Sequence, residues 1–233
     1  MISVYKSGTR GLTKIDWLTS YHSFSFGEYY NPSRIHFGPL RVINDDYLEP
    51  GGGFPTHPHK NMEIITIVLE GELSHTDSTG NSETIKYGEV QKMSAGTGIF
   101  HSEFNASDSE KLHLLQIWIL PETLELTPSY EKVFFNENDI TGKLFKVAAY
   151  KNAPVKIHQD VSLSIALFKK GENLNYTVSP RRKIYIHMIE GKVKIEDEFL
   201  EAGDAVEVED RAGFSLSFTE NSRFILFDMA GLG

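Results

Sequence analysis

Short runs of β-branched and aromatic residues constrain the fold of this chain more than any other feature of its sequence. Clear examples are EIITIVL at 63–69, LHLLQIWIL at 112–120, IYIHMI at 184–189 and FILF at 224–227. Turn-forming clusters rich in glycine separate such runs, and long segments with helical periodicity are scarce. Short strands between frequent turns are typical of β-sandwiches and barrels, so we expect an all-β fold.

The two halves of the chain share a pattern. The run IITIVLEG ends at Gly71 and the run IYIHMIEG ends at Gly191, and a second turn with glycine before an acidic residue follows in each half. A chain of 233 residues is long enough for two small domains. We therefore predict two jelly-roll β-barrels of similar plan, the first in residues 1–130 and the second in residues 131–233.

Composition narrows the classes of function. The formal net charge is −9, and a negative surface argues against nucleic-acid binding. The chain has no cysteine, so any metal must be held by nitrogen and oxygen ligands. No apolar run approaches the length of a membrane span, and residues 1–10 lack the apolar core of a signal peptide. We expect no membrane association and a cytoplasmic location.

Potential metal ligands gather in two tight clusters. The first is His57-Pro58-His59 and the second is His101-Ser102-Glu103. Residues two apart on a β-strand point to the same face, so each cluster presents two ligand side chains to one side.

The two clusters are placed symmetrically about Gly80, which lies in a strong turn signal. An antiparallel arrangement folded there puts His59 opposite His101 and His57 opposite Glu103. Curled into a jelly roll, it would point all four side chains into one barrel. The alternative, four unrelated polar residues in loops, does not explain the mirrored spacing. We therefore predict a metal site formed by these four residues.

Three imidazoles and a carboxylate suit several divalent metals, namely Fe, Mn, Co, Ni, Cu and Zn. Four protein ligands leave coordination positions open on a metal that prefers five or six. Open positions admit water, substrate or O2, which is what a catalytic metal needs. The ligand types alone leave the identity of the metal open.

These motifs resemble the cupin superfamily. The first cupin motif also contains a glutamate, which Glu63 nearly matches, but the spacing to Gly71 is one residue too long. A shift of one residue turns a strand side chain to the other face, so Glu103 is the better candidate for the fourth ligand. The stretches GGGFPTHPHKNMEIITIVLEG, MSAGTGIFHSEFN and LHLLQIWI resemble the pirin family, in particular its bacterial quercetinase-like branch.

The resemblance implies a bicupin with one metal, usually iron, in the N-terminal barrel. It places the ligands at His57, His59, His101 and Glu103. It also implies a quercetin 2,3-dioxygenase, which opens the flavonol ring with O2 and releases carbon monoxide. Glu103 would then act as ligand, as proton acceptor, or as both. Two alternatives stay open: a regulatory protein that binds a protein partner without turnover, and a non-oxidative metal enzyme such as an isomerase.

Other residues have weaker links to the site. Phe54, Met62 and Phe104 are candidates for lining the barrel against a flat aromatic substrate, while ordinary core packing is the alternative for each of them. His75 is expected on the outer surface. His113 is expected to be a hydrogen-bonded core residue, since it lies in an apolar strand. Gln116 and Trp118 alternate on one strand face and are candidates for supporting the ligands.

The second half does not repeat the ligands. Aligning the two halves on their shared glycines leaves residues that are poor metal ligands where the histidines and the glutamate stand. These are Thr177, Ser179, Leu216 and Phe218. We therefore expect a metal-free C-terminal barrel.

Overall fold

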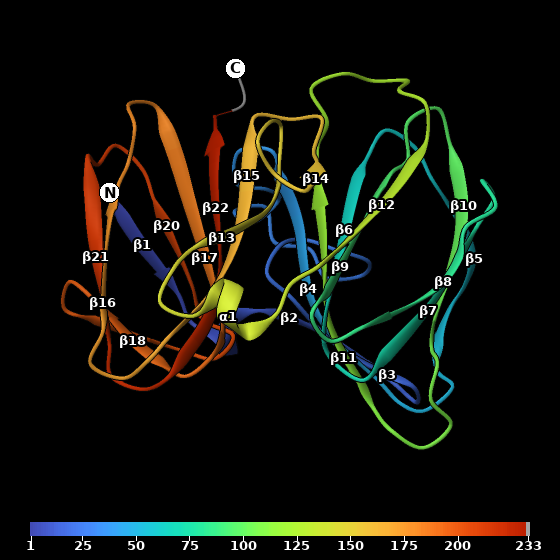
Figure 1. The fold of residues 1–233 in the computed structure, drawn as a ribbon, viewed down its shortest axis with the longest axis horizontal. Helices are drawn as coiled ribbons and strands as arrows, with labels where there is room; N and C mark the ends of the chain where they lie inside the picture. The colour runs from blue at the N-terminus through green and yellow to red at the C-terminus, as the bar shows by residue number, and fades with distance from the viewer. Residues whose placement is uncertain (232–233) are drawn as a thin grey trace. The chain divides into compact units, whose positions relative to one another are not determined.

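The computed structural model describes residues 1–231 and divides the chain into two compact units. The first barrel is Arg10–Phe134. The second barrel combines Met1–Thr9 with the chain from Phe135 onward. Both units consist almost entirely of β-strands (Figure 1), which confirms the predicted all-β fold.

The first barrel consists of two antiparallel sheets. The larger sheet has seven strands. In spatial order these are β12 (Ser129–Phe134), β9 (Glu89–Ser94), β6 (Glu63–Glu70), β11 (Leu112–Ile119), β4 (Leu40–Leu48), β3 (Leu18–His22) and β2 (Gly11–Ile15). The smaller sheet has four strands, in the order β5 (Gly53–His59), β10 (Ile99–Asn105), β7 (Glu72–Asp77) and β8 (Ser82–Lys86).

The second barrel also has a seven-stranded and a four-stranded sheet. The larger runs β1 (Ile2–Tyr5), β20 (Ala205–Val208), β17 (Arg182–Glu190), β22 (Ser222–Ala230), β15 (Val161–Phe168), β13 (Phe145–Ala149) and β14 (Val155–Lys156). The smaller runs β16 (Asn173–Thr177), β21 (Gly213–Phe218), β18 (Lys192–Ile195) and β19 (Glu198–Glu201). Within residues 1–231 the helices are the short α1 (Glu137–Ile140) and a 3-10 turn at Ser7–Thr9. Neither has the length or the apolar character to cross a membrane.

The strand order confirms the predicted repeat. The smaller sheet β5-β10-β7-β8 corresponds to β16-β21-β18-β19, and the run β9-β6-β11-β4 corresponds to β20-β17-β22-β15. Gly71 and Gly191 end equivalent strands with φ angles of 78° and 82°. A Cβ at Gly71 would lie 2.6 Å from the carbonyl oxygen of Lys111, and one at Gly191 would lie 2.1 Å from that of Asn221. Only glycine fits either turn.

The N-terminal strand belongs to the second barrel, which differs from our division at residues 130 and 131. Strand β1 pairs with β20, and it lies in blue among the orange and red strands of Figure 1. It fills the edge position that β12 fills beside β9 in the first barrel. The segment ISVY is too short for its sequence to indicate which barrel it completes.

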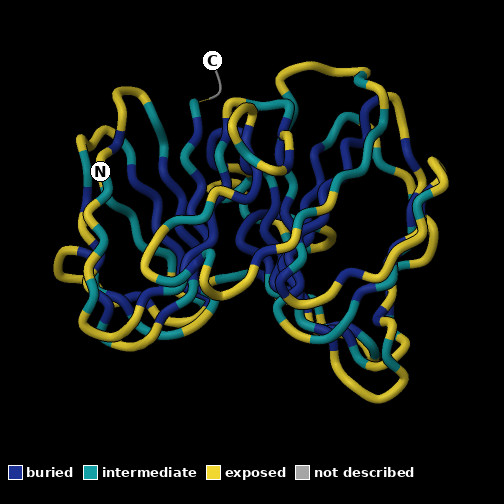
Figure 2. Tube along the Cα trace, viewed as in Figure 1, coloured by how far each residue is buried: buried dark blue, intermediate teal, exposed yellow. Residues whose placement is uncertain are grey.

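The interiors of the two barrels differ. The second barrel is filled by one hydrophobic cluster that includes Phe214, Leu216, Phe218 and Phe224. The first barrel contains smaller clusters, for example around Leu114 and around Met93. In both barrels the strands carry most of the buried positions, whereas the exposed ones gather in the turns (Figure 2). The first barrel therefore leaves room for a cavity.

Candidate metal centre

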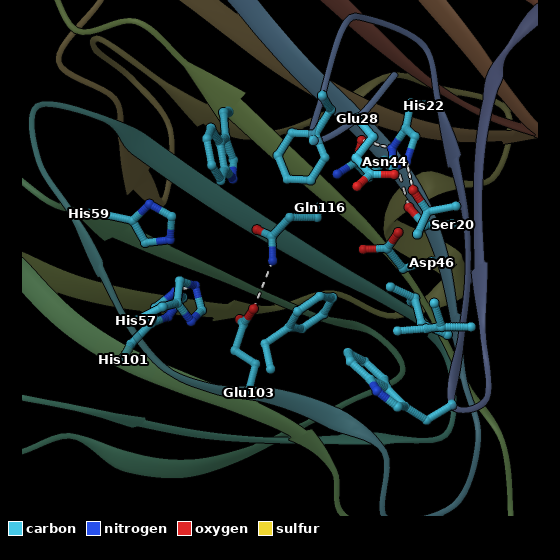
Figure 3. Close-up of a pocket in the computed structure, with 18 residues that line it drawn as sticks. Ser20, His22, Glu28, Asn44, Asp46, His57, His59, His101, Glu103 and Gln116 are labelled. Atoms are coloured by element: carbon cyan, nitrogen blue, oxygen red, sulfur yellow. Dashed lines mark hydrogen bonds between the residues drawn. The ribbon is translucent and has the colours of Figure 1, made fainter. Parts of the chain in front are cut away.

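Three histidines converge inside the first barrel. Strands β5 and β10 are antiparallel neighbours and bring His57, His59 and His101 together, and we refer to these residues as the histidine triad. One ring nitrogen of each lies within 4.8 Å of the others. The Nε2 atoms of His57 and His101 are 3.0 Å apart. Figure 3 shows the three rings on one side of a cavity. The predicted meeting of these residues is therefore seen in the structure.

The register of the two strands differs from the one we predicted. His101 lies opposite His57, while His59 lies opposite Ile99. A β-bulge between His101 and Glu103 shifts the pairing again, so Glu103 does not face His57. Counting symmetrically about one turn assumes a continuous hairpin. In the structure β6 and β9, which lie between the two strands along the chain, belong to the other sheet.

The protonation states of the histidine triad suit the binding of a cation. His57 Nδ1 lies 2.8 Å from the carbonyl oxygen of Pro55, so Nδ1 carries the proton that it donates to this oxygen. The lone pair on His57 Nε2 then faces His101. Burial, with a contribution from neighbouring histidines, lowers the pKa of His59 to about 4 and that of His101 to about 2. These two imidazoles are therefore neutral at pH 7, as metal binding requires. A divalent metal fits this donor set.

Glu103 is held by a set of amide and hydroxyl donors. Gln91 Nε2 donates to Oε1 at 2.7 Å, and Gln116 Nε2 donates to Oε2 at 2.8 Å. Thr66 Oγ1 donates to Oε1 at 3.3 Å. Burial raises the pKa of Glu103, and the hydrogen bonds from Gln116 and Thr66 oppose the rise. The carboxyl group thus has a fixed orientation and increased basicity.

Glu103 joins His101 in a second group of donor atoms. Its third member is His75, and the three ligand atoms lie within 4.8 Å of one another. The candidate ligands thus form two overlapping groups that share His101. Glu103 lies nearer to His75 than we expected, with His75 Nδ1 4.0 Å from its Oε1.

The cavity beside the histidine triad has a volume of about 430 Å³. Every residue that lines it belongs to the first barrel. They are Thr13, Ile15, Trp17, Leu18, Ser20, His22, Phe26, Gly27, Glu28, Asn44, Asp46, Phe54, His57, His59, His101, Glu103, Gln116 and Trp118. Most of the wall surface is apolar, although many of the lining residues are polar, and such a mixture is common in pockets for small organic molecules.

The sequence comparisons identify the family. The Pirin profile matches residues 5–119, and that of the quercetinase C-terminal cupin domain matches residues 148–229. The quercetin 2,3-dioxygenase of Escherichia coli strain K12 is 42% identical over 230 residues, which cover 98% of this chain and 99% of that protein. The chain belongs to the pirin family. The resemblance in its sequence motifs is therefore confirmed.

Solved structures agree with this assignment. The bacterial pirin YhhW of Escherichia coli, in complex with nickel(II), has a TM-score of 0.94 at 41% identity, with both chains fully covered. A quercetin 2,3-dioxygenase from Acinetobacter baumannii has a TM-score of 0.78 at 23% identity. That match covers 98% of this chain and 86% of the other, and it shows a common fold. This pirin is thus a bicupin, as predicted.

Our prediction for His75 was wrong. Its side chain is fully buried, its Nε2 lies 3.2 Å from Asp77 Oδ2, and its ring stacks on that of Tyr130. Strand β7 turns Leu73, His75 and Asp77 to the interior together, since all three are buried. The sequence does contain an indication of this burial. Leu73 is apolar and lies two residues before His75, so both side chains point to the same face of the strand.

Removing the His75 ring is expected to weaken metal binding although His75 does not line the cavity. It packs behind Glu103 and His101, and loss of such a supporting group typically costs about 10–100-fold in affinity. We expect this loss for His75→Ala, measured by competition with a chelating dye. Thr76→Ala, which changes the exposed next residue of the same strand, serves as the control. Equal affinity in the two variants would contradict the supporting role.

Two of the three expected cavity-lining residues are placed elsewhere. Phe54 lines the cavity as predicted. Met62 instead packs against the cluster that contains Met93, and Phe104 is 37% exposed. Gln116 and Trp118, which the sequence indicated only weakly, both line the cavity.

Glu63 is separated from the cavity, as strand parity predicts. Its Oε2 lies 3.3 Å from the Nζ atom of the fully buried Lys92. Thr66 lies three residues further along the same strand, so its side chain is on the opposite face and contacts Glu103. In this pirin Glu63, which nearly matches the glutamate of the general cupin motif, is therefore part of a buried ion pair.

His113 is hydrogen-bonded, as expected, and lies outside the two groups of candidate ligands. Its Nε2 lies 2.6 Å from Asp45 Oδ1, and its ring stacks on Tyr47. These contacts account for its place in an apolar strand.

Apolar residues occupy the equivalent positions of the second barrel. Through the pairing of β21 with β16 and β18, Phe214 and Leu216 correspond to His101 and Glu103. Tyr176 and Val178 correspond to the first pair of histidines. The alignment of the two halves on their glycines had instead placed Thr177 and Ser179 at the first pair, which is wrong by one residue. It had placed Leu216 and Phe218 at the second pair, which is wrong by two residues. That only the first barrel binds a metal stays a prediction, and these apolar residues favour it.

Asp46 is a second buried carboxyl group in the cavity wall. Burial raises its pKa to about 7, against a hydrogen bond from Ser20, and the charges of Asp45 and Glu103 add to the rise. In the unfolded chain its pKa returns to about 4. Between these values the folded protein binds more protons than the unfolded protein, so the contribution of Asp46 to stability falls as pH rises.

Asp46→Asn removes this pH-dependent destabilisation. We expect the melting temperature of the metal-free variant to exceed that of the wild type by a margin that grows from about pH 4 to about pH 7. Thermal unfolding at a series of pH values measures the margin. A margin that is the same at every pH would show that Asp46 ionises normally in the folded protein.

Proposed function

We propose that this pirin is a metal-dependent dioxygenase that opens the ring of quercetin or a related flavonol with O2. One observation supports this most strongly: neutral imidazoles and a buried carboxylate meet at the wall of a cavity of about 430 Å³ that four aromatic side chains also line, namely Trp17, Phe26, Phe54 and Trp118. The quercetin 2,3-dioxygenase of Escherichia coli is a relative along nearly the whole chain. A binding module would not need a ligand set beside a cavity large enough for a small organic molecule.

His57, His59, His101 and Glu103 are the proposed metal ligands. The histidine triad supplies three nitrogen atoms with lone pairs available, and Glu103 supplies an anionic oxygen near His101. We propose Fe(II) as the native metal, because nitrogen and oxygen donors that leave positions open suit iron chemistry with O2. The nickel in the YhhW complex fits the same donor types.

The metal, when bound, would stabilise the deprotonated flavonol and supply redox chemistry toward O2. Glu103 is the proposed acceptor of the proton from the 3-hydroxyl group. Its raised pKa makes it a better base than an ordinary glutamate, and Gln91 and Gln116 hold it in one orientation. Ring opening consumes O2 and releases one carbon atom as carbon monoxide.

Aromatic side chains would orient a flat substrate and exclude water. Phe26 packs edge-on against Trp118 with ring centroids 5.3 Å apart, and Trp17 packs edge-on against Phe54 at 5.1 Å. All four line the cavity. A planar flavonol buried between such walls leaves little space for water beside the reacting atoms.

Incubation with quercetin in the presence and absence of O2 tests the proposal. The iron-loaded protein should bleach the flavonol absorbance band and release carbon monoxide only with O2. Metal-free protein should do neither. An iron-loaded protein that binds quercetin but never turns it over would refute the activity and favour a regulatory role.

A further inference from the structure

A row of polar side chains crosses the larger sheet of the first barrel. Gln91, Thr66, Gln116 and Asn44 lie opposite one another on adjacent strands β9, β6, β11 and β4. Hydrogen bonds join Gln91 to Thr66 and Thr66 to Gln116, and both glutamines bind Glu103. One side of the cavity is therefore a connected network that positions Glu103.

Asn44 and its neighbour His22 are also satisfied. His22 Nδ1 lies 2.8 Å from Asn44 Oδ1, and His22 Nε2 lies 2.8 Å from the hydroxyl of Thr13. Both ring nitrogens of His22 thus have partners within the protein.

Asp46 differs from these residues. It lies two positions after Asn44 on β4, between Leu114 and Ser20 on the adjacent strands. It is 2% exposed and lines the cavity, yet its Oδ1 atom has no hydrogen-bond partner. Figure 3 shows the carboxyl group across the cavity from the histidine triad.

A buried carboxyl oxygen without a partner is costly for the fold. Leu114 on the adjacent strand and Leu48 two residues further along β4 belong to a hydrophobic cluster, and a leucine in place of Asp46 could pack against it. The neighbouring Asp45 is paired instead with Arg10 and His113. Since packing does not explain the acid at position 46, a ligand in the cavity is the natural partner for Oδ1.

The chemistry of a flavonol matches this arrangement. Its 3-hydroxyl and 4-carbonyl oxygens form one metal-chelating pair, and polyhydroxylated members carry further phenolic hydroxyls on their rings. With the chelating pair at the histidine triad, the aromatic body would lie along the apolar walls. A more distant ring hydroxyl could then reach Asp46, which has an acceptor oxygen in either protonation state.

We propose that Asp46 accepts a hydrogen bond from a ring hydroxyl of the substrate, remote from the metal centre, and thereby selects polyhydroxylated flavonols. This inference rests on the proposed function. It makes Asp46 a specificity-determining residue for substrate binding and gives it no part in the reaction with O2.

Binding without turnover tests the role of Asp46. Trp17 and Trp118 line the cavity, so their fluorescence should be quenched by a bound flavonol. Quercetin and 3-hydroxyflavone, which lacks the other hydroxyls, are titrated without O2 into metal-loaded wild type, Asp46→Leu and Asp46→Asn. We expect Asp46→Leu to bind quercetin about 10–100-fold more weakly and 3-hydroxyflavone within about twofold of wild type. Asp46→Asn keeps an acceptor oxygen and should show a smaller loss for quercetin.

The control is Asp108→Asn, which removes an exposed carboxylate outside the cavity lining and should leave both affinities unchanged. Melting temperature and metal content establish that each variant is folded and loaded. An equal loss for both flavonols, no loss for either, or no binding of either to wild type would overturn the inference. If quercetin binds as predicted but O2 never consumes it, the proposed activity fails and the role of Asp46 in binding stands.

Discussion

His101→Ala is expected to lose both the metal and all turnover of quercetin. His101 is the one residue common to both groups of candidate ligands, so its loss breaks up both groups of three donor atoms. We expect metal affinity to fall by more than the roughly 100-fold that loss of a ligand's hydrogen-bond partner can cost. Metal content after dialysis and the rate of quercetin bleaching measure the two effects.

The metal-free form of His101→Ala should stay folded. The side chain is buried, its Nδ1 atom has no hydrogen-bond partner and its Nε2 atom contacts His57, so its removal breaks a contact within the histidine triad and leaves the strand pairing intact. His113→Ala is a matched control, since His113 is also a strand histidine of the first barrel but pairs with Asp45 outside the cavity. That variant should keep its metal and its activity. A His101→Ala protein that retained both would refute the site.

Glu103→Gln is expected to separate metal binding from turnover. The histidine triad remains, so the variant should still bind metal, about tenfold more weakly without the anionic ligand. Turnover should fall by about 10²–10⁴-fold, the contribution typical of a positioned general base. In the wild type both carboxylate oxygens accept a hydrogen bond from a glutamine. In the variant one of these oxygens becomes an NH2 group, which cannot accept, so one of the two hydrogen bonds is lost. Metal titration and steady-state kinetics measure the two effects separately.

Glu63→Gln is the control for that experiment. Glu63 is also a buried glutamate of the first barrel, and it nearly matches the glutamate of the general cupin motif. Because its partner is Lys92, we expect the substitution to lower the melting temperature and leave the affinity for metal unchanged. Weakened metal binding in Glu63→Gln together with normal turnover in Glu103→Gln would contradict this assignment. Glu63 would then be the metal ligand, and Glu103 would have no part in turnover.

The sequence predicted the architecture and the histidine triad for physical reasons. Short β-branched runs specify strands wherever they lie, and Gly71 and Gly191 mark equivalent turns that only glycine fits. The H-x-H spacing fixes the shared direction of His57 and His59 once the segment is known to be a strand. These conclusions depend on local pattern alone.

The features that sequence analysis missed depend on which strands become neighbours. His75 enters the site because β7 pairs with β10, and the bulge after His101 shifts Glu103 along its partner strand. The edge position of β1 beside β20 is likewise set by tertiary pairing. Asp46 could not be assigned from sequence, because its significance lies in an unpaired oxygen inside a cavity.

The central claim is that one metal is bound at the histidine triad of the first barrel. Anomalous X-ray diffraction at the iron absorption edge, on crystals of the iron-loaded protein, tests it directly. We predict one strong anomalous peak per chain, within bonding distance of His57, His59 and His101. A peak among other residues, or none in crystals whose protein contains stoichiometric iron, would contradict the account.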